Sequence, residues 1–397
     1  MRKSTAFFAL APLLVLSCGG GSSGGGSSAS PTEALEFPGS EWTESSPADQ
    51  GMDAAGIEQA FDYAFQDGKE TQGVVVVKNG YLIAERYSDG ADASTLATSW
   101  SVAKSFTSAT IGIAVDSGAL EGIDLPVSDL ITRWKGTAKE DITIRALLEM
   151  RSGLDWNEGE SSTLYYIAEE DQVAAALDLD VVAPPHERFN YTSPNSMLLG
   201  EVVTAAVGRS QADFAQDRLF GPIGMSADWW LDGAGQTMGY CCIDATTRDF
   251  ARFGLLFARG GEWQGEQVVS RAWVEESTRP LPGAEFYSHH WWTRTQPGLP
   301  TDLYSAQGLH TQRIYVVPSL DLVVARNGSY QRVGDEAVRA GTNVHVTQPP
   351  DQWSDADFLR PIVAAVKGAA ESSQGPSSVS SALAERARAA LESAGLL

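Results

Sequence analysis

The sequence lacks the residues that mark several classes of protein. Among its 397 residues only three are cysteines, and they form neither a disulfide framework nor the ligand spacing of a metal site. Basic residues are also scarce, because 28 Lys and Arg stand against 51 Asp and Glu, a formal net charge of −23. Phosphate binding needs clustered Lys and Arg. We therefore expect no nucleic-acid partner, no metal ion and no cofactor.

Long apolar runs are missing as well, and the one at the N-terminus is too short to span a membrane. The run from Thr5 to Leu16 follows two basic residues and ends at Ser17-Cys18, a pattern typical of a bacterial lipoprotein signal. Gly and Ser then fill most of the next stretch, which predicts a flexible tether. We expect a signal peptide over residues 1–17, a lipidated Cys18 with its tether over 18–40, and an exported, membrane-anchored lipoprotein on the periplasmic side or cell surface.

The two remaining cysteines, Cys241 and Cys242, are neighbours in the chain. A bridge between adjacent residues is strained because disulfides need a wider separation of the two backbones. We therefore expect two buried thiols.

A Ser-x-x-Lys motif, Ser101 to Lys104, opens a small and apolar stretch with helical periodicity that runs to Leu120. Residues three apart on a helix share a face, so the two side chains are expected to point the same way. The free N–H groups of a helix N-terminus suit a developing oxyanion. A desolvated lysine can lose its proton and accept one from a serine. The alternative is that Ser101 caps the helix while Lys104 reaches solvent.

The order of predicted elements indicates one sheet that is completed from both ends of the chain. The elements are a helix over residues 54–68, a hairpin over 73–87, helices and loops over 121–235, a hairpin over 313–327 and a closing helix over 355–368. We predict an α/β (α+β) fold with an antiparallel sheet flanked by helices and a large helical insert. This domain is expected over residues 41–370, with a Ser/Ala-rich tail over 371–397.

Six different short motifs lie along this domain. They are the segments 99–105, 147–153, 189–191, 222–225, 241–249 and 307–312. In this order they resemble the serine β-lactamase/penicillin-binding-protein superfamily, and more specifically the β-lactamase-related serine hydrolases that include class C β-lactamases, esterases and 6-aminohexanoate-dimer hydrolases. The resemblance implies a β-lactamase/transpeptidase-like fold.

The resemblance also implies roles for individual residues. Ser101 would be the acylating nucleophile and Lys104 its neutral partner, while Tyr191 would relay a proton across the cleft. A phenol with an ordinary pKa near 10 can act as a base only beside groups that ease its ionisation. Ser193 fills the third position of the family's Tyr-x-Asn/Ser box and is a candidate substrate contact. The alternative for Tyr191 is a core tyrosine with a satisfied hydroxyl.

A third box is expected on the strand that faces the cleft, where β-lactamases carry Lys-Thr-Gly. Alignment puts Ala306-Gln307-Gly308 in this place, so the cation is missing. The N–H groups of Leu309 and Ser101 would then form the oxyanion hole, with Gly308 close to the substrate. A second register uses His310-Thr311-Gln312, which leaves His310 as a possible cleft residue. The remaining histidines are expected to be structural or on the surface: His186, His289, His290 and His345.

The leading hypothesis is therefore an exported serine hydrolase that cleaves a small ester or amide through an acyl-enzyme. The first alternative is a β-lactamase or D,D-peptidase, against which the missing cation counts. The second is an inactive, surface-tethered binding protein, against which the intact Ser101, Lys104 and Tyr191 count.

Overall fold

The computed structural model of the chain describes residues 35–159, 166–293, 296–329 and 353–367. The predicted signal peptide, Cys18, most of the tether, His345 and the Ser/Ala-rich tail lie outside these residues. Among the described residues, no helix combines the length and the apolar character needed to cross a membrane.

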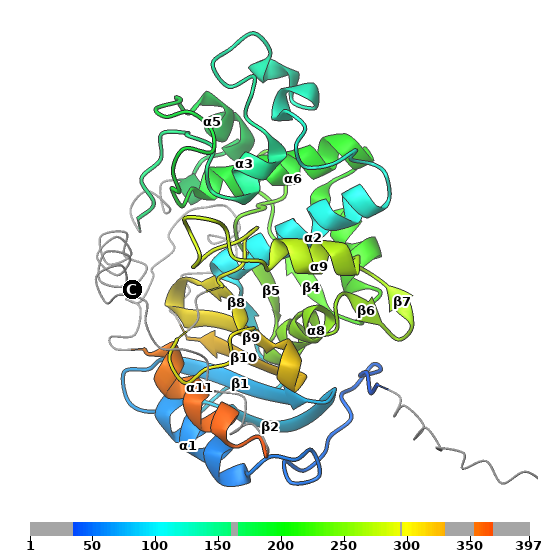
Figure 1. Cartoon of the computed structure of the whole chain (residues 1–397), viewed down its shortest axis with the longest axis vertical. Helices are drawn as coiled ribbons and strands as arrows, with labels where there is room; N and C mark the ends of the chain where they lie inside the picture. The colour runs from blue at the N-terminus through cyan, green and yellow to red at the C-terminus, as the bar shows by residue number, and fades with distance from the viewer. Residues whose placement is uncertain (1–34, 160–165, 294–295, 330–352, 368–397) are drawn as a thin grey trace, which may run out of the picture. The chain divides into compact units, whose positions relative to one another are not determined.

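A five-stranded antiparallel sheet forms the base of the fold, with strand order β2-β1-β10-β9-β8 (Figure 1). The strands are β1 Thr71–Lys78, β2 Tyr81–Tyr87, β8 Tyr304–Gly308, β9 Gln312–Val317 and β10 Leu322–Gly328. Strand β1 from the start of the chain pairs with β10 from its end, so the prediction of one sheet completed from both ends is confirmed.

The first hairpin forms where Asn79 and Gly80 join β1 to β2. Both residues have positive φ angles, 56° and 85°. The tightest hairpin turns need this conformation at both central positions, and Asn-Gly adopts it readily. Because the turn fixes the register, Val75 and Val77 face one side of the sheet and Val74 and Val76 the other.

Two apolar cores result from this alternation, one on each face of the sheet. Helices α1 (Ala54–Ala64) and α11 (Asp355–Ala364) pack together over one face, shown below the sheet in Figure 1. Helix α8 (Thr247–Ala258) packs on the other face against β1, β9 and β10. Thr246 caps α8 by accepting the N–H of Asp249 at 3.0 Å.

The long middle of the chain is largely helical and lies beside the sheet (Figure 1). Its helices are α2 Ala103–Asp116, α3 Ile144–Leu148, α5 Gln172–Asp178, α6 Ser193–Val207, α7 Gln211–Ala215 and α9 Arg271–Ser277, with short turns η1 Trp100–Val102, η2 Val127–Asp129, η3 Thr132–Trp134 and η4 Gln216–Phe220. This is the antiparallel sheet with a helical region that the sequence predicted.

Short strands in this region were not predicted. They form a three-stranded sheet of β3 Leu96–Thr98, β5 Ile243–Thr246 and β4 Ala227–Trp229, and a hairpin of β6 Glu262–Trp263 and β7 Glu266–Gln267. Strands of two to four residues are too brief to show a period-two pattern in the sequence. The small sheet matters because β3 leads directly into η1 and so places the Ser-x-x-Lys segment.

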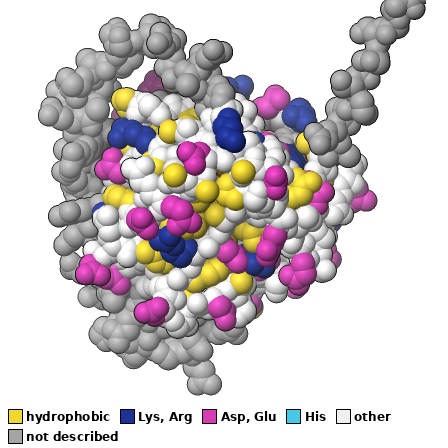
Figure 2. Space-filling view, turned by 90° about the horizontal axis from the view of Figure 1, so that it is seen from below, with side chains coloured by type: hydrophobic (Ala, Val, Ile, Leu, Met, Phe, Trp, Pro, Cys, Tyr) yellow, Lys and Arg dark blue, Asp and Glu magenta, His cyan; other side chains and the backbone are white. Residues whose placement is uncertain are grey.

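Acidic and basic side chains are interspersed on the face of the molecule shown in Figure 2, with apolar side chains between them. Together with the net charge of −23, this surface gives no support for phosphate-backbone binding.

Candidate active site

Ser101 lies in the tight turn η1 between β3 and α2. Its neighbour Trp100 has φ 48°, a conformation that non-glycine residues seldom adopt. Ser99 fixes this turn: its hydroxyl donates to the carbonyl of Trp100 at 3.0 Å and accepts the N–H of Ile243 at 2.8 Å. Strand, turn and helix together hold Ser101 two residues before Ala103, the first residue of α2.

Lys104 is directed at Ser101, as the three-residue spacing predicted. Its Nζ is 3.0 Å from Ser101 Oγ, and it also donates to Ser193 Oγ and to the carbonyl of Tyr240, both at 3.1 Å. The side chain is 1% exposed, so the alternative in which it reaches solvent is wrong. Burial lowers the pKa of Lys104 to about 8, although the negative charge of Glu158 acts in the opposite direction. Near neutral pH this amine can therefore exist without its proton.

Tyr191 lies close to both Ser101 and Lys104. Lys104 Nζ lies 4.9 Å from the centre of its ring, and its hydroxyl makes a hydrogen bond with Ser101. Burial, reinforced by the charge of Glu158, raises the pKa of Tyr191, and the bond to Ser101 only partly opposes this. Tyr191 is therefore a neutral phenol here, able to accept one proton while it donates another, rather than a phenolate base.

Glu158 is a residue of this site that the sequence analysis missed. Its carboxylate accepts the hydroxyl of Ser193 at 2.6 Å and the N–H of Ser193 at 3.0 Å. It lies in a loop 35 residues before Ser193, outside any periodic pattern. Only the folding of this loop against the start of α6 brings the two residues together.

The end of β8 lies against the Ser101 turn. A Cβ atom added to Gly308 would meet the carbonyl oxygen of Ser99 at 2.5 Å and the nitrogen of Ser101 at 3.1 Å, so only glycine fits there. This geometry supports the first register of the third box, in which Leu309 follows Gly308 at the edge of the site. In that register Ala306 is fully buried and supplies no cation.

His310 of the second register is buried rather than exposed to a cleft. Its ring packs edge-on against Trp100 at 5.4 Å between centroids, and its carbonyl accepts from Arg326. Burial lowers the pKa of His310 to about 4, with the charge of Arg326 adding to the effect. A neutral, packed imidazole supports the turn after β8. Among the other described histidines, His289 and His290 are buried and His186 is more exposed.

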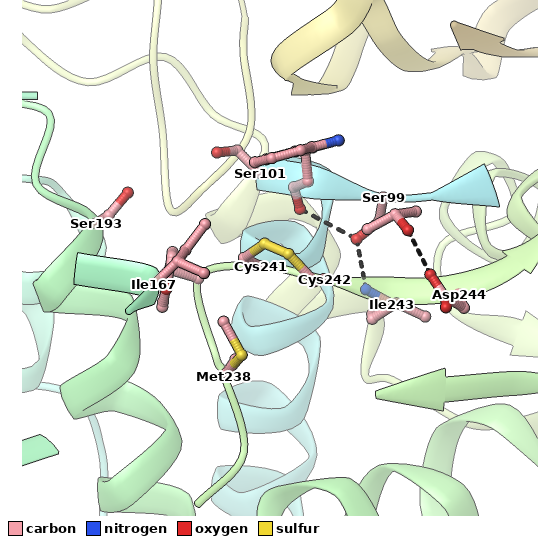
Figure 3. Close-up of a disulfide and its surroundings, with 12 residues drawn as sticks. Ser99, Ser101, Ile167, Ser193, Met238, Cys241, Cys242, Ile243 and Asp244 are labelled. Carbon is pink, nitrogen blue, oxygen red and sulfur yellow. Dashed lines mark hydrogen bonds between the residues drawn. A yellow bond between two sulfur atoms is a disulfide. The ribbon is translucent and has the colours of Figure 1, made fainter. Parts of the chain in front are cut away.

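The expectation of two buried thiols is wrong, because Cys241 and Cys242 form a disulfide (Figure 3). The pair is buried, as expected, and lies between the segment of Ser193 and that of Ser99 in the view of Figure 3. Its neighbours on both sides serve the site, since Tyr240 accepts from Lys104 and Ile243 donates to Ser99. Adjacent cysteines can pair when the local backbone departs from ordinary conformations, and Cys242 has φ 129°.

Within the described ranges, no group of three or more His, Cys, Asp or Glu side chains is arranged to hold a metal ion. The groups around Ser101 are instead a buried lysine with a lowered pKa, a neutral phenol and a glycine-edged strand. Such a serine, with an adjacent base and backbone donors at a helix start, is the arrangement of a serine hydrolase that works through an acyl-enzyme.

Comparison with known proteins places the chain more narrowly. It matches the family described as Beta-lactamase over residues 61–345, which is more than half of its length, and it belongs to that family of serine hydrolases. This match confirms the resemblance to β-lactamase-related serine hydrolases that the sequence motifs indicated. It also confirms the β-lactamase/transpeptidase-like fold.

Individual relatives are distant. The 6-aminohexanoate-dimer hydrolase of Paenarthrobacter ureafaciens is 23% identical over 290 residues, 66% of this chain and 73% of that protein. A putative 6-aminohexanoate-dimer hydrolase from Bacillus anthracis has a similar structure, with a TM-score of 0.60 and 22% identity over 72% of this chain and 77% of that one. A family VIII carboxylesterase has a TM-score of 0.58 and 16% identity over 78% and 96% of the two chains. At these identities the two structures show the shared fold alone.

Proposed function

We propose that this serine hydrolase cleaves small esters or amides, with Ser101 as nucleophile, Lys104 as base and Tyr191 as proton relay. The observation that carries the proposal is the contact of 3.0 Å between Lys104 Nζ and Ser101 Oγ, with burial lowering the pKa of Lys104 to about 8. Serine is a weak nucleophile unless an adjacent base takes its proton. Among the described residues, Lys104 is the group so placed.

The chemistry follows from these positions. Lys104, as a neutral amine, takes the proton of Ser101 while Ser101 Oγ attacks the substrate carbonyl carbon. The N–H groups of Ser101 and Leu309 would hold the resulting oxyanion, and each such donor typically contributes ~3 kcal/mol of barrier lowering. Tyr191 passes a proton to the leaving alcohol or amine as that bond breaks and is reprotonated by Lys104, which becomes neutral again. Water then attacks the acyl-enzyme and loses its proton to Lys104, which returns a proton to Ser101 Oγ as the acid leaves.

The names of the relatives support both substrate classes, an amide for the 6-aminohexanoate-dimer hydrolase and an ester for the carboxylesterase. The third box argues against efficient β-lactam turnover, because Ala306 offers no partner to the substrate carboxylate. A missing charge-assisted hydrogen bond typically costs about 1.5–3 kcal/mol.

Fluorophosphonate labelling of the wild type and of Ser101→Ala tests the proposal. We expect covalent labelling of the wild type alone, together with faster hydrolysis of short-chain p-nitrophenyl esters than of nitrocefin. An unlabelled wild type would instead favour an inactive binding protein. Nitrocefin turnover at the rate of a true β-lactamase would favour the penicillin-recognising alternative.

We further propose that the protein is exported and anchored to a membrane through a lipid on Cys18. The signal-like run, the single cysteine and the Gly/Ser tether support this. Cys18→Ser is expected to move the protein from the membrane pellet to the soluble exported fraction. A wild type that is already soluble after fractionation would contradict the anchor.

A further inference from the structure

Glu158 is a carboxylate held by hydrogen-bond donors beside Ser101 and Lys104. It is 8% exposed, and it accepts from the N–H and the hydroxyl of Ser193 and from the indole N–H of Trp156. An ionised carboxylate is an acceptor alone, so three donors arranged around it suit the charged form. A buried charge of this kind is costly unless its partners are fixed. Its environment therefore holds Glu158 in one position.

This arrangement fixes the hydroxyl proton of Ser193. A serine hydroxyl has one proton to donate, and Ser193 points it at Glu158 Oε1 over 2.6 Å. Toward Lys104 Nζ, 3.1 Å away, the oxygen of Ser193 can then only accept. The direction of this bond is set by Glu158 and not by Ser193 itself.

The orientation of the Lys104 amine follows. Besides Ser101, Lys104 Nζ has two partners, the Ser193 hydroxyl oxygen and the carbonyl oxygen of Tyr240. With Glu158 in place both are obligate acceptors. A neutral amine has two N–H bonds and one lone pair, so the two N–H bonds go to these acceptors and the lone pair is left facing Ser101 Oγ at 3.0 Å. This is the orientation that proton transfer from Ser101 requires.

We infer that Glu158 is a positioning residue of the reaction: acting through Ser193, it turns the lone pair of Lys104 toward Ser101. This inference rests on the proposed function, since it concerns the same base. The charge of Glu158 has a second, electrostatic effect, because it opposes the lowering of the Lys104 pKa by burial. Removal of the charge is therefore expected to lower that pKa further.

The test is the pH dependence of ester hydrolysis by Glu158→Gln. The glutamine amide can donate to Ser193, which frees the Ser193 proton to compete for the Lys104 lone pair. We expect kcat to fall about 10- to 100-fold on the plateau, less than the roughly 10²- to 10⁴-fold that a complete general-base contribution usually supplies, because Lys104 itself remains; KM should change little. From the pKa of Lys104 we expect the acid limb of kcat/KM near pH 8 in the wild type, and we expect it at lower pH in Glu158→Gln. Glu158→Asp keeps the negative charge, so its acid limb of kcat/KM is expected at the same pH as in the wild type.

Glu149→Gln is the matched control. Glu149 is a second carboxylate that is 8% exposed, but its neighbours are His289 and Arg151, at 3.7 Å each. Its loss is expected to change thermal stability and leave the acid limb in place. If Glu158→Gln behaves in the same way, Glu158 only supports packing and the inference is overturned.

Ser193→Ala separates orientation from charge and serves also if Glu158→Gln does not fold. It removes the bridge and keeps the carboxylate, so the plateau rate should fall while the acid limb stays close to that of the wild type. An undiminished plateau rate in Ser193→Ala would overturn the inference. Fluorophosphonate labelling tells failure of the proposed function from failure of the inference about Glu158. A wild type that does not label would contradict the proposed function. Normal labelling with unshifted pH profiles in the variants would contradict the role of Glu158 alone.

Discussion

Lys104 and Arg326 are the least exposed of the lysine and arginine side chains buried among the described residues, and they do different things. Lys104 in the helical region is 1% exposed, and Arg326 on β10 of the sheet is 0% exposed. Arg326 donates to the carbonyls of His310, Thr311 and Lys69 and to the hydroxyls of Thr71 and Thr311, and it lies 4.3 Å from the ring centre of Trp353. Lys104 has three oxygen partners, one of which is the hydroxyl of Ser101.

The difference shows that a buried cation does not by itself indicate a catalytic group. Burial lowers the pKa of both groups, that of Arg326 to about 9 and that of Lys104 to about 8. Guanidinium starts from a much higher value and keeps its charge, so Arg326 joins backbone segments that are distant in sequence. The compact amine of Lys104 can lose its proton beside a hydroxyl that can give one. Replacing the lysine by arginine should therefore remove activity, whereas replacing the arginine by lysine should reduce stability.

The largest effect is expected for Lys104→Arg. Arginine keeps the positive charge but stays protonated, so it cannot accept the proton of Ser101. We expect kcat/KM for a p-nitrophenyl ester to fall by at least ~10³-fold, with an unchanged far-ultraviolet circular dichroism spectrum. Near-normal esterase activity at neutral pH would show that lysine is not the base.

The reciprocal change, Arg326→Lys, should damage the fold and spare the chemistry. An ammonium group cannot reach carbonyls on both sides as the planar guanidinium does, which leaves buried acceptors without donors. We expect a loss of about 2–4 kcal/mol in the free energy of unfolding, measured by urea denaturation. The rate per folded molecule should stay within about tenfold of the wild type. A stable Arg326→Lys variant without activity would instead indicate that Arg326 acts in the active site, and it would contradict the structural role of Arg326.

A smaller effect concerns the dependence of stability on pH. In the folded protein the pKa of Lys104 is about 8, against 10.5 for an unperturbed lysine. Between these values the unfolded chain binds more protons than the folded one, so the contribution of Lys104 to stability rises with pH across this window and is least favourable below pH 8. Relative to Lys104→Met, the wild type should gain about 2–3 kcal/mol between pH 7 and pH 10. Parallel stability curves for the two proteins would show that the lysine pKa is not lowered.

Much of the fold could be predicted because its signals are local. The turn at Asn79-Gly80 and the apolar runs of β1 and β10 are readable from a few residues each. The short strands β3, β4 and β5 were missed because each is too brief to show a period-two pattern, and because β3 pairs with β5, more than a hundred residues further along the chain. The disulfide between Cys241 and Cys242 was missed for a related reason, since the sequence does not reveal the unusual backbone at Cys242.

By itself the sequence determined that Ser101 and Lys104 share one side of a helix start, because helical periodicity fixes the relation of residues three apart. Its order of motifs also indicated the family. The tertiary structure alone decided the state of the lysine: burial, the carbonyl of Tyr240, and Ser193 with Glu158 come from separate segments of the chain. Desolvation and hydrogen-bond direction depend on what surrounds a group in space, and a linear pattern does not contain that information.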